Sequence, residues 1–267
     1  MRSMADHWPE YLSEALCLGI FMMSAAAWAT LLQHPSSPLA RWQPSPLVRR
    51  IPMGLAMGAT AMALIYSPPG RLSGAHMNPA VTLTFFRLGK VRAVDAAGYV
   101  AAQLAGGAAG IGAAAWTLRG LPAHPSVHYV ATVPGAAGSA VAFLAEALIS
   151  FGMMSMVLRV SNSARAAHLT GLCAGALVAL YIVVEAPFSG MSMNPARSFG
   201  PALLAHTVRS LWIYVTAPLA GMLAAAELFL RTRGRAHVRC AKLDHPLHVR
   251  CIFRCGYAAA QEERLAS

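Results

Sequence analysis

The sequence contains few charged residues for its length. Only 12% of its 267 residues are Asp, Glu, Lys or Arg, whereas an average soluble domain carries roughly 25%. No polar stretch is long enough to fold by itself, which argues against a separate soluble catalytic domain. Hydrophobic residues make up 57% of the chain and the mean hydropathy is positive. The composition therefore indicates a membrane protein.

Acidic residues are the scarcest charged class. The chain has 10 of them against 21 Lys and Arg, a formal net charge of +11. Such an excess can indicate nucleic-acid binding, but most of these basic residues lie in short loops and after residue 230. That distribution is typical of the cytoplasmic segments of membrane proteins. We therefore expect a lipid bilayer as a partner, and no nucleic acid.

Two further features are missing. The N-terminus has no signal-peptide cleavage pattern before its first apolar run, so we expect that run to be retained as a span. The sequence also indicates no disulfide framework. Cys17 and Cys173 fall in apolar runs, and the other three cysteines lie in a basic tail that a cytosol would keep reduced.

Long apolar runs are abundant. Spanning a bilayer takes about 20 apolar residues per helix, and six stretches qualify: 11–33, 48–67, 94–116, 138–160, 169–187 and 210–230. Two shorter runs, 79–88 and 195–205, each begin at an Asn-Pro pair after a loop rich in Gly and Ser. Because they are too short to cross, we interpret them as re-entrant half-helices lining a wet cavity.

The two halves of the chain resemble each other. "SEALCLGIFMMS" at 13–24 matches "AEALISFGMMSM" at 145–156, and "SGAHMNPA" at 73–80 matches "SGMSMNPA" at 189–196. Each half has three spans, an odd number, so the second half enters the membrane in the opposite orientation. We therefore expect an all-α membrane protein with an inverted repeat. Its segments are an N-terminus (1–10), a first repeat (11–116), a connecting loop (117–137), a second repeat (138–230) and a tail (231–267).

The Asn-Pro pairs suit helix starts. Asn is a preferred N-cap, and Pro is favoured at the first helical position. One such pair is usually only a turn signal, but two identical Met-Asn-Pro-Ala cores in matching places favour a lined pore. Two helix N-termini aimed at one point place about half an elementary positive charge each there. Cations and protons are repelled, while a neutral hydroxylic molecule can accept hydrogen bonds from the two amides.

At these motifs the chain resembles the major intrinsic proteins, the aquaporins and glycerol facilitators, over about residues 8–232. The resemblance implies six transmembrane helices plus two re-entrant half-helices, one pore per subunit and a homotetramer. We also expect no cofactor and no enzymatic activity. The resemblance assigns the paired pore motifs to Asn78, Pro79, Ala80, Asn194, Pro195 and Ala196. It also implies that Glu14, Glu146 and Gln103 hold the loops that carry these motifs.

The same resemblance implies a selectivity filter at the outer constriction. Arg197 matches the family's Arg, and counting back from Asn194 gives Met191 and Ile182. Span two supplies Met57, or Gly58 if one residue is inserted. The apolar filter residues favour small solutes such as glycerol, whereas the Ser198 and Ala202 signature resembles that of water channels.

We therefore expect a passive channel for water and small uncharged solutes that excludes protons and ions. The first alternative is a glycerol or small-neutral-solute facilitator with water as a minor permeant. The alternative from another class is an ion-coupled secondary transporter, which also uses inverted repeats and broken helices. It is disfavoured because few ionisable residues lie near the midplane. An enzyme is disfavoured because no nucleophile–base pairing or intramembrane metal motif stands out.

The basic residues also predict orientation. With the N-terminus inside, the inner face receives Arg87, Lys90, Arg92, Arg159, Arg165 and the basic tail, so both termini are expected in the cytoplasm. We expect the protein in a plasma membrane, and the compact chain with short loops suggests that this is a bacterial inner membrane.

The tail contains Cys and His residues that could bind a soft metal: Cys240, His245, His248, Cys251 and Cys255. Their spacings match no standard zinc finger, and the interleaved Arg and Lys would repel a cation. We therefore expect a basic tail at the inner leaflet and no metal. If these residues did bind a metal, the tail would be a metal- or redox-sensitive regulatory element.

Overall fold

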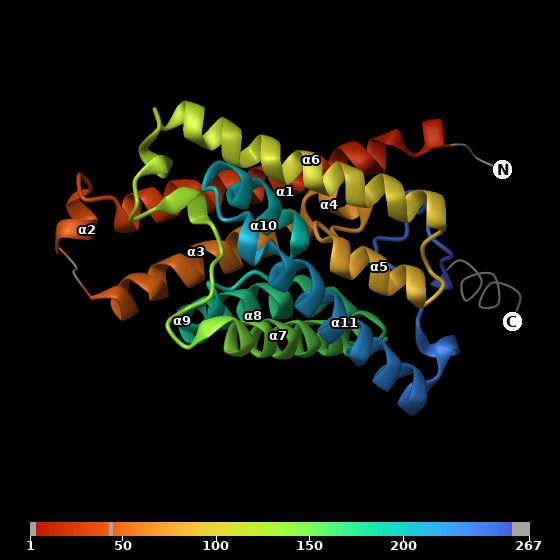
Figure 1. Ribbon diagram of the computed structural model, residues 1–267. Coiled ribbons are helices and arrows are strands. Elements are labelled where there is room, and N and C mark those ends of the chain that lie inside the picture. Colours follow the sequence, from red (N-terminus) through yellow and green to blue (C-terminus); the bar gives the residue numbers. More distant parts are fainter. Residues whose placement is uncertain (1–3, 43–44, 258–267) are drawn as a thin grey trace, which may run out of the picture.

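The computed structural model describes residues 4–42 and 45–257, and this part of the chain is helical with no strand (Figure 1). Six long helices form a bundle: α1 (Trp8–Gln33), α3 (Pro46–Tyr66), α6 (Ala93–Thr117), α7 (Gly138–Ser161), α8 (Thr170–Val184) and α11 (Leu211–Arg233). Two short helices lie within the bundle, α5 (Pro79–Arg87) and α10 (Pro195–Leu204). All eight helices lie close to where the apolar runs predicted them.

Five of the long helices are long and apolar enough to cross a membrane: α1, α3, α7, α8 and α11, the last two counted with the short turns that precede them. The sixth, α6, has the length, at 25 residues. It is not among those five, and it contains several glycines together with Asp95 and Gln103. The chain is therefore a multi-pass membrane protein.

The long helices pack chiefly in three pairs, α1 with α6, α7 with α11, and α3 with α8. The first pair lies in one repeat, the second is its counterpart in the other repeat, and the third joins the two. Glycine permits the close approach: Gly110 of α6 faces the backbone of Gly19, and Gly58 of α3 faces the backbone of Gly175. Small residues at the crossing are how membrane helices gain van der Waals contact.

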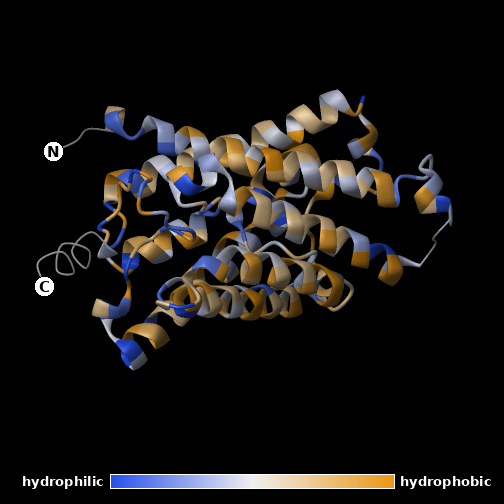
Figure 2. Ribbon diagram, turned by 180° about the vertical axis from the view of Figure 1, so that it is seen from behind, coloured by the Kyte–Doolittle hydropathy of each residue, from blue (hydrophilic) through white to orange (hydrophobic). Residues whose placement is uncertain are grey.

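The outside of the bundle is apolar. Large hydrophobic side chains such as Leu144 and Leu148 of α7 are 60% and 69% exposed, as expected where helices face lipid. Figure 2 shows hydrophobic residues along the long helices, while many hydrophilic residues gather toward the two ends of the bundle.

Several short elements were not predicted. These are α2 (Pro38–Trp42), α4 (Pro68–Ser73), α9 (Ala186–Ser189) and the 3-10 turns η1 (Met4–Asp6), η2 (Leu121–Ala123), η3 (His128–Val130), η4 (Ala167–Leu169), η5 (Val208–Ser210) and η6 (Arg235–His237). The helices α4 and α9 occupy matching places, each just before a re-entrant loop. Each ends at a glycine with positive φ, Gly74 at 95° and Gly190 at 84°, a conformation that glycine adopts without strain.

The tail differs from the expected segment at the inner leaflet. Its residues 238–257 fold back against the end of the bundle, and the buried side chains are those of Val238, Cys240, Ala241, Lys242, Leu243 and Phe253. The reason is that apolar residues alternate with the basic ones, and burying them against the first re-entrant loop removes their surface from water.

Candidate functional site

The two asparagines of the repeated motif cap the two half-helices. Asn78 Oδ1 accepts a hydrogen bond from the Ala80 backbone N–H at 2.9 Å, at the start of α5. Asn194 Oδ1 accepts from the backbone N–H groups of Ala196 and Arg197 at 3.0 and 3.2 Å, at the start of α10. Pro79 and Pro195 occupy the first helical position, where a missing N–H costs nothing.

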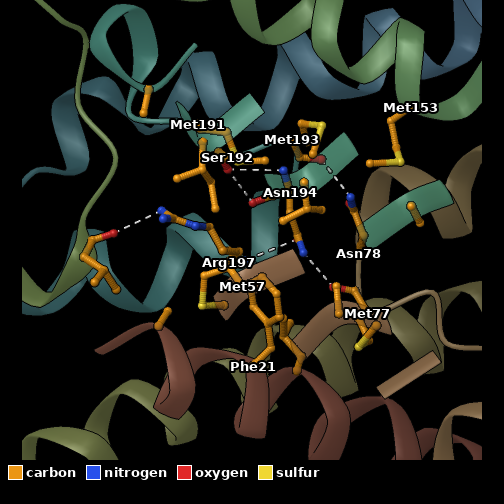
Figure 3. Close-up of a pocket in the computed structure, with 18 of the residues that line it drawn as sticks. Phe21, Met57, Met77, Asn78, Met153, Met191, Ser192, Met193, Asn194 and Arg197 are labelled. Atoms are coloured by element: carbon orange, nitrogen blue, oxygen red, sulfur yellow. Dashed lines mark hydrogen bonds between the residues drawn. The ribbon is translucent and has the colours of Figure 1, made fainter. Parts of the chain in front are cut away.

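The same asparagines bind the two loops to each other (Figure 3). Asn78 Nδ2 donates to the Met193 carbonyl at 2.7 Å, and Asn194 Nδ2 donates to the Met77 carbonyl at 2.6 Å. The two helix N-termini therefore meet, as the inverted repeat predicted. An Asn amide has two N–H donors, so one remains on each side chain, and both side chains line a cavity.

A buried carboxylate holds the first loop. Glu14 of α1 accepts from Ser73 Oγ at 2.7 Å, from the backbone N–H groups of His76 (2.9 Å) and Met77 (2.5 Å), and from Gln103 Nε2 (2.7 Å). A carboxylate inside a bundle is costly unless its oxygens are paired. Four donors pair this one and set the path of the loop that leads to Asn78.

The second loop repeats this arrangement. Glu146 of α7 accepts from Ser189 Oγ at 2.6 Å and from the backbone N–H groups of Ser192 and Met193 at 2.7 Å each. The copies differ at one partner: Gln103 stands four residues after Tyr99, whereas Pro218 stands four residues after Tyr214. An amide donor to the carboxylate in the first repeat thus has no counterpart in the second.

Two tyrosines were missed by the sequence reasoning. Tyr99 donates its hydroxyl to the Ser73 carbonyl, and Tyr214 donates its hydroxyl to the Ser189 carbonyl, both at 2.6 Å. They fix the turns at which the two re-entrant loops begin. The signal that could have found these turns was the Ser-Gly pair present in both copies of the repeat.

The re-entrant loops are strained in matching places. Ala75 and Met77 in the first loop, and Met191 and Met193 in the second, have φ between 47° and 56°, a region that non-glycine residues rarely adopt. Each costs about 1–3 kcal/mol and persists only where the surroundings fix it. Here the hydrogen bonds to Glu14 and Glu146 do so. The strained backbone turns the carbonyls of Met77 and Met193 toward the opposite asparagine.

A cavity of about 290 Å³ contains both asparagines. Its lining extends from Gln33 and Arg50, at one end of the bundle, to Leu243 of the tail at the other. Most of the wall is apolar, and its few polar side chains include Asn78, Asn194 and Arg197, with Gln33, Arg50, His76 and Ser192. An apolar wall with a few placed donors is the usual construction of a selective pore.

The expected filter residues all line this cavity: Met57, Ile182, Met191 and Arg197. Of the two candidates in span two, Met57 faces the cavity. Gly58 lies at the crossing with α8, where a Cβ would overlap the Gly175 carbonyl oxygen. The guanidinium of Arg197 is held by donating to the Val130 carbonyl at 3.0 Å.

The connecting loop was expected only to join the repeats. Instead Val127, Val130 and Ala131 contribute to the cavity wall, and Thr132 shares a 2.7 Å hydrogen bond with Ser198 of α10. No motif in the loop marked this role, because the contacts join residues far apart in sequence.

The tail brings four of its five candidate ligands together. Cys240, His245, Cys251 and Cys255 have their ligand atoms within 4.8 Å of one another, and His248 is not part of this group. None of the five cysteines is paired in a disulfide. Hydrogen bonds from Cys240 and Cys251 lower the pKa of the Cys255 thiol. Burial opposes a charge on His245, but its hydrogen bonds with Cys251 and Cys255 outweigh burial and raise its pKa to about 9.

Comparisons with known proteins agree with this architecture. The family model described as major intrinsic protein matches residues 1–229. The chain is 39% identical over 176 residues to aquaporin NIP1-1 of Oryza sativa subsp. japonica, an alignment covering 65% of this chain and 60% of that protein. It is 36% identical over 189 residues to aquaporin NIP1-2 of Arabidopsis thaliana, covering 68% and 62%. The chain thus spans less than two thirds of the length of these relatives.

A solved structure has the same fold. The aquaglyceroporin from Plasmodium falciparum superposes with a TM-score of 0.68 at 20% sequence identity, covering 86% of this chain and 98% of that one.

Proposed function

Because the chain belongs to the major intrinsic protein family, we propose that it is a passive membrane channel for water and small uncharged solutes. The observation that carries this proposal is the pair of asparagine amides, Asn78 and Asn194, held at the junction of two helix N-termini in the wall of one cavity. Each amide has an N–H left for a passing molecule.

The arrangement accounts for exclusion of cations and protons. Two helix N-termini contribute partial positive charge at the same point, and Arg197 adds a full charge close by. A neutral molecule with an oxygen acceptor gains hydrogen bonds from the two amides. A cation gains nothing there and loses its hydration, so it meets an electrostatic barrier.

The filter favours solutes that have both carbon and hydroxyl faces. Met57, Ile182 and Met191 are apolar, and the two methionines can change rotamer at low cost. Arg197 is the polar group in this set. This composition supports the alternative that small neutral solutes such as glycerol are the main permeants, with water as a minor one. The named relatives are aquaporins and the superposed structure is an aquaglyceroporin, so the comparisons leave both permeants open.

Stopped-flow light scattering on proteoliposomes tests the proposal. An impermeant osmolyte reports water efflux, and a glycerol gradient reports solute entry through re-swelling. Fast shrinkage without re-swelling indicates a water channel, and rapid re-swelling indicates a solute facilitator. Leu243 lines the end of the cavity next to the tail, so Leu243→Ala widens that end. Absence of both fluxes in the folded wild type and in Leu243→Ala contradicts the proposal.

A matched pair of variants on α3 assigns the flux to this cavity. Met57 is 1% exposed and lines the cavity, whereas Leu55 is 63% exposed on the outside of the same helix. Met57→Trp is expected to remove most of the flux by filling the constriction, and Leu55→Trp is expected to leave it unchanged. Equal flux in the two variants would mean that solutes cross by another route.

An ion-coupled transporter is the alternative from another class. Glu14 and Glu146 are buried acidic groups, and their oxygens are engaged in holding the two re-entrant loops. We therefore expect flux to follow the solute gradient alone. Dependence of solute entry on an imposed proton or sodium gradient would favour the transporter instead.

The assembly and orientation are also proposals. We propose a homotetramer with one pore per subunit, on the family resemblance, and cytoplasmic termini, on the positive-inside rule. In support of a common side, Arg250 of the tail donates to the Asp6 carbonyl near the N-terminus. The relatives are plant proteins, so the bacterial inner membrane suggested by the compact chain gains no support from them.

A further inference from the structure

The four-residue cluster in the tail has the dimensions of a metal site. The ligand atoms of Cys240, His245, Cys251 and Cys255 all lie within 4.8 Å of one another. Cys240 Sγ and Cys251 Sγ are 3.6 Å apart, and Cys255 Sγ and His245 Nε2 are 3.2 Å apart. In a tetrahedral zinc site with Zn–S near 2.3 Å, two sulfur ligands stand about 3.8 Å apart. The sulfur–sulfur distance is too long for a disulfide, which needs about 2.05 Å.

The ligand type and the surrounding charge also suit zinc. Three cysteines and one histidine form one of the usual closed structural sets for Zn²⁺. Three thiolates around a dication leave one net negative charge, so nearby basic residues stabilise the loaded site and do not oppose it. Lys242 is almost fully buried in the same segment, and its Nζ donates to the Arg71 carbonyl at 2.7 Å. The Tyr257 backbone N–H donates to Cys255 Sγ at 3.4 Å, which helps to orient that ligand.

The segment that carries these ligands lies across the inner end of the cavity. Leu243 is part of the cavity wall, and its backbone N–H donates to the Gly74 carbonyl at 3.1 Å. The Ala241 carbonyl lies 2.8 Å from His76 Nε2, and the Phe253 ring stacks on His76 at 5.4 Å with the planes 9° apart. The tail thus packs directly on the re-entrant loop that leads to Asn78.

The tail also joins both repeats at this face. Arg254 N–H donates to the Lys90 carbonyl of the first repeat at 2.9 Å, and Arg239 N–H donates to Asn162 Oδ1 of the second at 2.6 Å. An ion pair of 2.7 Å connects Arg71 with Asp244. These contacts attach the segment to both repeats.

In sequence, the ligands flank two tail residues that pack on the first re-entrant loop. Leu243 lies between Cys240 and His245, and Phe253 lies between Cys251 and Cys255. Residues 238–256 contain no α-helix or strand that could hold this shape by itself. One metal ion bound by both ligand pairs would hold Leu243 and Phe253 in place, because a closed metal site contributes folding free energy directly.

We propose that Cys240, His245, Cys251 and Cys255 bind one Zn²⁺ ion, and that the metal holds the tail folded with Leu243 closing the inner mouth of the cavity. The tail is thereby a zinc-dependent gate. The metal site stands independently of the channel, whereas the gating rests on the proposed function.

Metal content tests the first half. The full-length chain, purified in detergent and equilibrated with Zn²⁺ followed by gel filtration, is expected to retain one zinc per chain by elemental analysis. His245→Ala and Cys251→Ser are expected to lose it. Two controls are expected to keep it: His248→Ala, which lies outside the cluster, and Cys173→Ser in α8. A folded wild type that retains no zinc, or a Cys240–Cys251 disulfide found by mass spectrometry after purification under reducing conditions, overturns the site.

Permeability tests the second half. Proteoliposomes loaded with zinc are expected to conduct several-fold more slowly than the same vesicles after treatment with a zinc chelator. Leu243→Ala is expected to conduct quickly while still holding zinc, and Leu247→Ala, which is 61% exposed on the tail, is expected to behave as wild type. Zinc retention with identical flux in every form overturns the gate and leaves the metal site and the channel standing. No flux in any form, chelated or Leu243→Ala, overturns the proposed channel instead.

Discussion

Ile182 is the residue with the clearest consequence for selectivity. It lines the same cavity as Arg197 and offers no hydrogen bond. Ile182→His adds a donor and an acceptor and makes the constriction more polar, so it favours water over a solute with a carbon face. We expect the ratio of glycerol to water permeability to fall, because glycerol loses its apolar contact while water gains a partner. Stopped-flow measurement of both fluxes on the same vesicles checks this.

The apolar substitution Ile182→Val is the matched control. It keeps the apolar wall, so the ratio should stay near that of the wild type. If Ile182→His and Ile182→Val change the ratio of glycerol to water permeability equally, selectivity is set by the width of the constriction. The polarity of the side chain at position 182 would then play no part.

Glu146 is the residue that holds the second re-entrant loop. In Glu146→Gln, one carboxylate oxygen is replaced by an amide NH2, which cannot accept from a backbone N–H. One of the two N–H groups now bound, Ser192 or Met193, is then buried without a partner, at a cost of about 1–3 kcal/mol. We expect a lower unfolding temperature in detergent, followed by tryptophan fluorescence, together with reduced water flux.

Glu227→Gln provides the comparison for that loss. Glu227 is half-exposed and pairs with Arg87 at 2.7 Å, and such surface pairs contribute about 0–1 kcal/mol. Its unfolding temperature should therefore change little. A loss as large as that of Glu146→Gln would mean that removing any carboxylate destabilises the bundle, irrespective of the loop.

At the scale of the helix, close packing of α1 on α6 depends on glycine. A Cβ at Gly110 would overlap the carbonyl oxygen and Cα of Gly19, whereas a Cβ at Gly112 of the same helix meets nothing within 4 Å. Gly110→Ala is expected to separate the two helices and cost about 1–3 kcal/mol, the usual range for overpacking. Gly112→Ala should be neutral or slightly stabilising, because alanine favours the helix. Thermal unfolding of both variants tests the difference, and equal unfolding temperatures would contradict it.

The elements were predictable to different degrees. Each long helix, and each half-helix after Asn78 or Asn194, is marked by a local signal: an apolar run, or an Asn cap followed by Pro. The turns α4 and α9 carry no apolar run of their own. Each ends at a serine, Ser73 or Ser189, that donates to a buried carboxylate lying 59 or 43 residues away in sequence, which no local pattern predicts.

For the whole molecule, the internal repeat was the strongest guide. It predicted that two half-helices meet, and it led to the candidate pore residues Asn78 and Asn194. The tail has no counterpart in the repeat, so its fold had to be inferred from composition alone. Composition predicted a basic segment but not the burial of Leu243 and Phe253. Their burial depends on pairing with Gly74 and His76, contacts that no local pattern encodes.

The orientation of the whole molecule gives the last prediction. The N-terminal segment and the tail meet at one end of the bundle, where Arg250 pairs with Glu10 at 3.1 Å, so we expect both on the same side of the membrane. The basic residues favour the cytoplasm for that side. In cells, a fluorescent-protein fusion at either end should therefore fluoresce, and an alkaline phosphatase fusion at either end should be inactive. A phosphatase inserted at Gly120, in the connecting loop at the other end, should be active. Active phosphatase at both ends together with inactive phosphatase at Gly120 would mean the opposite orientation. Active phosphatase at one end and inactive phosphatase at the other would contradict an even number of spans.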